Sequence, residues 1–154
     1  MLRQNPHLLL MGALDFSASD LAANSKGAFS PTQKHGIQQA HFRHIALLVI
    51  AAICVWIGGI ELNLDWMVMV FGTVVLVSLM LGVYHGLQAD LESPVQAIAG
   101  RVNIAFLMWG SRVQVNGDTF RASRSVGEAF KPGHIYRLYH TAHSRLILSA
   151  ELVA

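Results

Sequence analysis

Two apolar stretches decide the fold: IALLVIAAICVWIGGI at residues 45–60 and WMVMVFGTVVLVSLMLGVY at residues 66–84, separated by ELNLD at residues 61–65. Neither apolar stretch contains Asp, Glu, Lys or Arg. At ~1.5 Å of rise per residue, a helix over the first stretch is about 24 Å long and needs Phe42 or Leu62 to reach the ~30 Å of a bilayer core, whereas the second is long enough alone. The sequence predicts a transmembrane helical hairpin over residues 45–87, with spans at about 45–62 and 64–87.

A pair of core helices in a soluble protein is the alternative interpretation. Such helices carry apolar runs of about 10–14 residues. Two longer uncharged runs, in a chain of 154 residues of which only 13% are charged, favour the membrane. The single cysteine, Cys54, lies in the first run, so no disulfide can form within the chain.

Charge divides the chain into three parts: residues 1–44 carry a net +2, residues 45–100 a net −4, and residues 101–154 a net +4. Basic residues close to membrane spans stay on the cytoplasmic side. Lys34, Arg43 and Arg101 therefore predict an integral protein of the bacterial inner membrane with both termini in the cytoplasm. We expect this basic charge to face anionic lipid headgroups rather than nucleic acid, because no nucleic-acid-binding motif accompanies it.

Residues 1–44 are expected to form an N-terminal cytoplasmic helical segment. Arg3 and the apolar run 8–14 resemble the start of a signal peptide without a clear cleavage site, so we expect the run to be retained, and Met11 is a possible alternative start. Ser17 or Ser19 can cap a short helix that ends near Asn24.

The sequence Ser30-Pro31-Thr32-Gln33 matches a capping box with proline at the first helical position. It predicts a helix that runs unbroken from Pro31 into the first span. The amphipathic beginning of this helix is expected at the membrane interface, where the Arg43 side chain can extend toward the headgroups.

After a linker at residues 88–100, the apolar pattern changes to period two, which is typical of strands. Residues 102–108 alternate, Asn116-Gly117 predicts a tight hairpin turn, and further strands are expected at 135–140 and 146–152. Residues 101–154 thus predict a small cytoplasmic antiparallel β domain, an SH3-like or OB-like barrel or a curled sheet. The fold class is membrane α+β. Two spans followed by a small β domain resemble the layout of several bacterial membrane proteins, including the NfeD-like group.

Small residues form a strip on each predicted span. They are Ala51, Cys54 and Gly58 on the first, and Ser78, Gly82 and Gly86 on the second. Small residues at intervals of about four allow another helix to approach closely. Either the two strips pack on each other within the hairpin, or one of them receives a helix of a partner.

Three histidines, His41, His44 and His85, fall at similar depth near the cytoplasmic ends of the two predicted spans. Imidazoles placed in this way can ligate a metal, a haem iron or the magnesium of a chlorophyll. The alternative is that headgroups and water solvate them and that no cofactor is bound.

His140, His143 and Ser144 lie close together in sequence, with Glu151 as the nearest acid. A hydrolase would require an oriented Ser-His-acid arrangement and an oxyanion hole, and no Gly-x-Ser-x-Gly motif is present. We therefore expect a polar loop at this point and a chain that is not an enzyme.

The leading hypothesis is a small accessory or scaffold subunit that docks on a larger membrane protein complex through its hairpin and its β domain. A cofactor-carrying subunit of an electron-transfer or light-harvesting complex, which binds haem or chlorophyll, is the alternative. A hydrolase is the third class.

Overall fold

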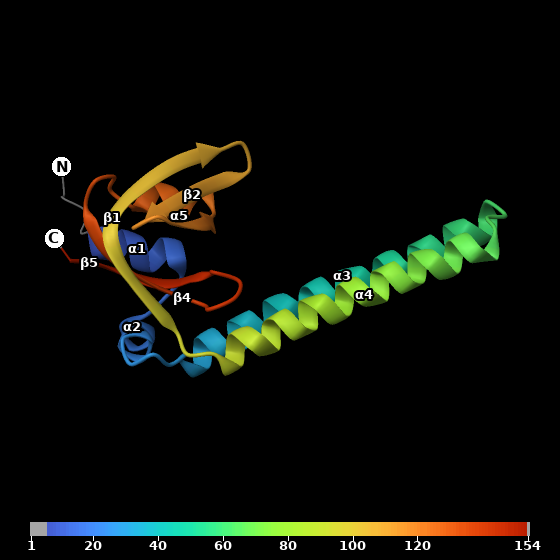
Figure 1. Cartoon of the computed structure of the whole chain (residues 1–154), viewed down its shortest axis with the longest axis horizontal. Helices are drawn as coiled ribbons and strands as arrows, with labels where there is room; N and C mark the ends of the chain where they lie inside the picture. Colours follow the sequence, from blue (N-terminus) through green and yellow to red (C-terminus); the bar gives the residue numbers. More distant parts are fainter. Residues whose placement is uncertain (1–5, 154) are drawn as a thin grey trace. The chain divides into compact units, whose positions relative to one another are not determined.

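The computed structural model describes residues 6–153, so Met1 and Arg3 lie outside the described residues. The chain divides into two compact units (Figure 1). One unit joins the N-terminal residues up to Lys34 with the C-terminal residues from Asp90 onward, and we call it the sheet unit. The other comprises His35–Ala89, and we call it the helical unit.

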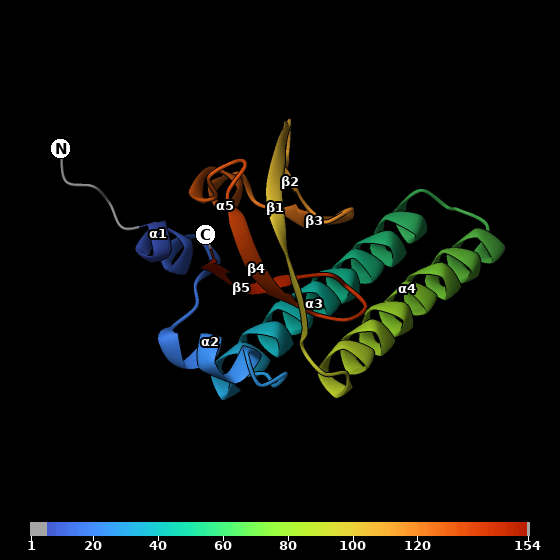
Figure 2. The same ribbon diagram turned by 60° about the vertical axis from the view of Figure 1, so that its left-hand side comes forward.

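Two long helices form the helical unit: α3 spans Pro31–Glu61 and α4 spans Trp66–Glu92. They run side by side (Figure 2). The predicted capping box of α3 is confirmed, because the Gln33 N–H donates to Ser30 Oγ at 3.1 Å and the Ser30 N–H donates to Gln33 Oε1 at 3.4 Å. Both helices are long and apolar enough to cross a membrane.

The turn between α3 and α4 is closed by polar groups. Asn63 adopts a φ of 52°, and Asp65 Oδ1 accepts the Met67 N–H at 2.9 Å, which begins α4. Further from the turn, the Trp56 indole N–H of α3 donates to Thr73 Oγ1 of α4 at 2.7 Å. This bond links the two helices directly.

One face of α4 is less exposed than the rest of the helix. Between Met69 and Leu87 the buried or half-buried positions recur at intervals of three or four residues, apart from the adjacent Gly72 and Thr73, and this is the period of a single helix face. They are Met69, Gly72, Thr73, Leu76, Met80, Val83 and Leu87. Because Met69 contacts Gly59 and Thr73 contacts Trp56, we take this face as the seam with α3.

The sheet unit is built on a five-stranded antiparallel sheet of order β3-β2-β1-β4-β5. The strands are β1 (Gln96–Leu107), β2 (Gly110–Val115), β3 (Asp118–Ala122), β4 (Ile135–His140) and β5 (Ile147–Leu152). The first half of β1 pairs with β4 and its second half pairs with β2. Figure 1 shows β1 as one long curved strand that the two halves of the sheet share.

Of the two turns that connect β1, β2 and β3, only one could be predicted from the sequence. The predicted Asn116-Gly117 turn is confirmed, with φ angles of 49° and 90° that suit this pair. The turn at residues 108–109 was not predicted, and β1 begins at Gln96, within the stretch 88–100 assigned to the linker. The added part of β1 pairs with β4, about forty residues away, so local pattern does not reveal it.

Three short helices complete the sheet unit: α1 (Pro6–Leu14), α2 (Ala18–Asn24) and α5 (Arg124–Ala129). The run at residues 8–14 is therefore helical, and its Leu10 is completely buried in the core. The core consists of Leu10, Phe16, Val102, Val113, Val115, Phe120, Val126, Phe130, Tyr136, Leu138, Ile147 and Ala150.

Polar contacts connect the N-terminal part of the sheet unit to β5. Ser17 caps α2 in a reciprocal capping box with Asp20. The buried Asn24 Nδ2 donates to Ser149 Oγ at 2.7 Å, and Gln33 Nε2 donates to the Leu148 carbonyl at 3.2 Å. The beginning of α3 is thereby attached to the same unit as the strands.

Candidate functional site

The small-residue strips of the helical unit lie away from the seam between α3 and α4. Gly82 and Gly86 are exposed, and a Cβ added at either position, or at Gly58, would meet nothing within 4 Å. Ala51, Cys54 and Ser78 are also exposed. Within the described residues, the strips therefore remain open, and Gly59 rather than Gly58 receives a side chain of the other helix.

Helical rotation explains this difference. At ~100° per residue, Gly82 lies about 140° around α4 from Met69, the first residue of the seam, so it points away from α3. Sequence spacing identified small residues that share a face, but it did not specify which face meets the other helix.

The predicted histidines are not brought together. The rings of His41 and His44 lie 6.4 Å apart between centroids, whereas His85 contacts its own neighbour Tyr84 at 6.0 Å. His85 lies about 160° around α4 from Met69 and so faces away from α3. In the part of the chain that the structure describes, no three His, Cys, Asp or Glu side chains form a group that could hold a metal ion.

His41 and His44 nevertheless share one feature that matters for ligand binding. Nδ1 of His41 bonds to the Ile37 carbonyl at 2.9 Å, and Nδ1 of His44 bonds to the Ala40 carbonyl at 2.7 Å. Because a carbonyl only accepts, each Nδ1 must carry the proton, which leaves Nε2 of a neutral ring with a free lone pair. Backbone bonds of this type orient metal-ligating histidines.

The polar loop between β4 and β5 uses its candidate groups for structure. Ser144 Oγ bonds to Thr141 Oγ1 at 2.7 Å, and His143 Nε2 bonds to Ser93 Oγ at 3.3 Å. The buried Asp90 carboxylate accepts the N–H groups of His143, at 2.8 Å, and Ser144, at 3.1 Å. These bonds fix the loop in the form of a turn around Asp90.

The other two members of the predicted polar group are equally engaged. Nδ1 of His140 bonds to the Thr141 carbonyl at 2.8 Å, and its ring packs 4.9 Å from that of Phe120. Glu151 accepts from Arg137 at 3.0 Å and from Tyr139 at 2.9 Å. Burial, and then the nearby Glu151 carboxylate, raise the pKa of Tyr139, so its hydroxyl keeps its proton and donates to Glu151.

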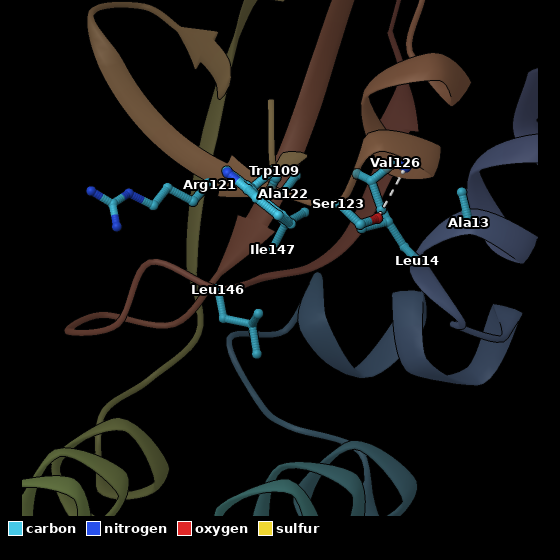
Figure 3. A pocket seen from close by; sticks show the side chains of 9 residues that line it. All are labelled: Ala13, Leu14, Trp109, Arg121, Ala122, Ser123, Val126, Leu146 and Ile147. Carbon is cyan, nitrogen blue, oxygen red and sulfur yellow. Dashed lines mark hydrogen bonds between the residues drawn. The ribbon is translucent and has the colours of Figure 1, made fainter. Parts of the chain in front are cut away.

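A pocket of about 440 Å³ lies in the sheet unit, between α1, the β1–β2 turn, the end of β3 and the start of β5 (Figure 3). Its lining is mostly apolar and consists of Ala13, Leu14, Trp109, Arg121, Ala122, Ser123, Val126, Leu146 and Ile147. In Figure 3 the Arg121 side chain extends away from Leu14.

The pocket was not predicted from the sequence. Its residues come from five separate parts of the chain, namely α1, the β1–β2 turn, β3, α5 and the start of β5. Trp109, which the β1–β2 turn contributes to the lining, is almost fully exposed.

Comparison of the chain with protein-family models, with curated proteins and with solved structures finds no match.

Proposed function

We propose that the chain is a small integral membrane subunit that docks on a larger membrane protein complex through the open faces of its helical unit, with the sheet unit as a second docking surface. The observation that carries this proposal is the exposure of the helical unit's apolar side chains. Leu47, Ile53 and Phe71 are 63%, 54% and 71% exposed, and such side chains require lipid or protein to cover them. A soluble core helix would bury them within its own chain.

The distribution of aromatic residues supports the membrane placement. Trp66 and Tyr84 are exposed at the two ends of the second apolar stretch. Eighteen residues of helix at ~1.5 Å each separate them by about 27 Å, close to the thickness of a hydrocarbon core. Tryptophan and tyrosine concentrate at the two interfaces of a membrane.

We place both termini on the cytoplasmic side of a bacterial inner membrane, because Lys34, Arg43 and Arg101 flank the spans on one side and Glu61 and Asp65 lie at the turn on the other. In sealed inverted vesicles, a protease added from outside should then remove a C-terminal epitope tag. Protection of the tag there, with digestion in right-side-out vesicles, would reverse the orientation.

The small-residue strip of α4 provides the test of docking. In native membranes solubilised in mild detergent, the chain should copurify with a stable set of partners, and Gly82→Leu should remove them because a large side chain prevents close helix approach. Val77→Phe is the matched control: it enlarges an exposed residue five positions away, about 140° around the helix. Migration of the chain alone before any substitution contradicts the proposal.

A cofactor-carrying subunit is the second candidate, and the backbone bonds of His41 and His44 favour it. His44 is exposed, and its Nε2 is free to ligate a haem iron or a chlorophyll magnesium. A visible absorption band in the native protein that His44→Ala removes, and that His35→Ala leaves in place, supports this candidate. A native spectrum with only aromatic absorption contradicts it.

We retain the SH3-like or OB-like description of the sheet as part of this proposal. Its support is the way in which β1 is shared between two halves of a small antiparallel sheet.

A further inference from the structure

The turn between β1 and β2 carries two large apolar side chains that are almost fully exposed. Met108 and Trp109 are 87% and 93% exposed, and the preceding Leu107 is 47% exposed. We call these three residues the tip. Covering an aromatic ring that is so completely exposed lowers the free energy, because apolar surface is removed from water.

The residues on both sides of the tip are closely packed. Gly110, which follows it, passes so close to β3 that an added Cβ would lie 2.8 Å from the Ala122 carbonyl oxygen. On the other side, Phe106 approaches α5 at Gly127, where an added Cβ would lie 3.1 Å from the Phe106 ring. The exposure of the tip therefore comes from the pairing of well-packed strands.

Positive charge without a counter-charge lies beside the tip. Arg112 on β2 and Arg121 on β3 are exposed and directly opposite each other in the sheet, an arrangement in which like charges repel. Among the described residues the ion pairs involve Arg124, Arg137 and Arg145, and neither of these two arginines. The stretch 95–117 contains no Asp or Glu.

We infer that the tip inserts into the headgroup region of an anionic bilayer while Arg112 and Arg121 bind lipid phosphates. The headgroup region of a bilayer accounts for both the exposed tip and the two arginines. Tryptophan prefers the depth of the headgroups, and arginine binds phosphate through two parallel N–H groups. The inference rests on the proposed function, since only membrane-spanning helices keep the sheet unit next to a bilayer. The connection is short: α4 ends at Glu92 and β1 begins at Gln96.

The experiment uses the full chain with Trp56→Phe and Trp66→Phe, so that Trp109 is the only tryptophan. The protein is reconstituted into vesicles of phosphatidylcholine alone or with phosphatidylglycerol, and quenching of Trp109 fluorescence by lipids brominated on the acyl chain is measured. Quenching should be strong with phosphatidylglycerol and weak without it. Each of Arg112→Gln and Arg121→Gln should reduce the ratio of inserted to exposed tip about fivefold, because a cation near an anionic membrane contributes roughly 1 kcal/mol.

Flotation of the same vesicles separates this inference from the proposed function. If the full chain fails to float with vesicles after an alkaline wash, the membrane-spanning proposal itself fails. If it floats and Trp109 emits as in water in both lipids, the tip does not insert and the inference is wrong. If Trp109 is covered only in native membranes and crosslinks there to a protein, the tip docks on protein, which also overturns the inference.

The double variant Met108→Ser, Trp109→Ser completes the test. Crosslinking of the tip to lipid, through a photoactivatable group on the exposed position Leu107→Cys in a Cys54→Ala chain, should fall several-fold with these substitutions while flotation is unchanged. Val153→Ser, which also replaces an exposed apolar residue of the sheet unit, should leave the crosslink as it was.

Discussion

The two units of this chain use similar apolar residues in opposite ways. The sheet unit encloses its valines, leucines and aromatic side chains around one core, so that Val102, Phe120 and Leu138 are at most 1% exposed. The helical unit leaves comparable residues uncovered, and Phe71 is 71% exposed. The first unit supplies its own apolar environment, whereas under the proposed function lipid or a partner protein covers the second.

The largest expected effect comes from removing the same kind of side chain from each unit. Phe120→Ala should lower the free energy of unfolding of the sheet unit by about 3–5 kcal/mol, because it removes a buried ring and leaves a cavity. Phe71→Ala should change it by no more than about 0.5 kcal/mol, as exposed substitutions do. Denaturant unfolding in a mild detergent measures both, and equal losses would show that the two phenylalanines have similar surroundings.

The N-terminal helix offers a second comparison, within a single element. Leu10→Ala should destabilise the sheet unit by about 2–5 kcal/mol, because Leu10 is completely buried. Leu8→Ala, at a position that is 65% exposed, is the control and should have little effect. A chain that begins at Met11 should then unfold at a lower temperature than one that contains α1; an unchanged melting temperature would mean that α1 adds nothing to the core.

Glycine substitutions extend the comparison to close packing. A Cβ on Gly127 would lie 2.6 Å from the Ser111 side chain, whose hydroxyl donates to the Ser123 carbonyl at 2.7 Å. Gly127→Ala should therefore cost about 1–3 kcal/mol through overpacking. Gly36→Ala, where an added Cβ meets nothing within 4 Å, should be neutral or should stabilise the helix by up to about 1 kcal/mol. Thermal unfolding followed by circular dichroism distinguishes the two, and a stabilising Gly127→Ala would contradict the packing described.

The smallest expected effect is the pH dependence of the sheet unit. Burial of Asp20 raises the pKa of its carboxyl, but hydrogen bonds from Ser30, Ser17 and Thr32 together outweigh burial and hold it below its ordinary 3.8. The folded state therefore binds this proton less tightly than the unfolded state does. The resulting stability is fully present above pH 3.8 and is lost as the pH falls through the lower folded pKa.

Asp20→Asn should remove this contribution. Between pH 5 and pH 2 the stability of the natural chain should fall more steeply than that of Asp20→Asn, as measured by unfolding at a series of pH values. Parallel curves for the two proteins would show that another group dominates the acid response. Asp15→Asn is the control, because Asp15 is exposed on the adjacent turn.

Local chemistry could be predicted from the sequence where neighbouring residues decide it. The capping box of Ser30 and Gln33 and the turn at Asn116-Gly117 depend on a few adjacent residues, and both predictions are confirmed. The two long apolar helices follow from composition and length alone. Their insertion in a membrane stays a prediction.

What could not be predicted depends on distant contacts and on helix rotation. The position of His85 along α4 follows from counting residues. Its direction around the helix axis depends on which face of α4 packs against α3, and that face contains Met69 and the less exposed residues that recur every three or four positions after it. The pocket beside Trp109 likewise requires α1 and the start of β5 to be placed together. Neither relation is present in any short stretch of sequence.

The shared strand β1 has a consequence for the order in which the sheet assembles. Its second half meets β2 across a turn of two residues, and β2 meets β3 across another, so this three-stranded meander depends only on contacts that are close in sequence. The first half of β1 must wait for β4, whose residues are made some 34–44 positions later. Because pairing between distant segments is slow, we expect the meander to form early and β4 with β5 to complete the sheet last. In a pulse-labelling hydrogen-exchange experiment, the Val113 amide should be protected before that of Leu138.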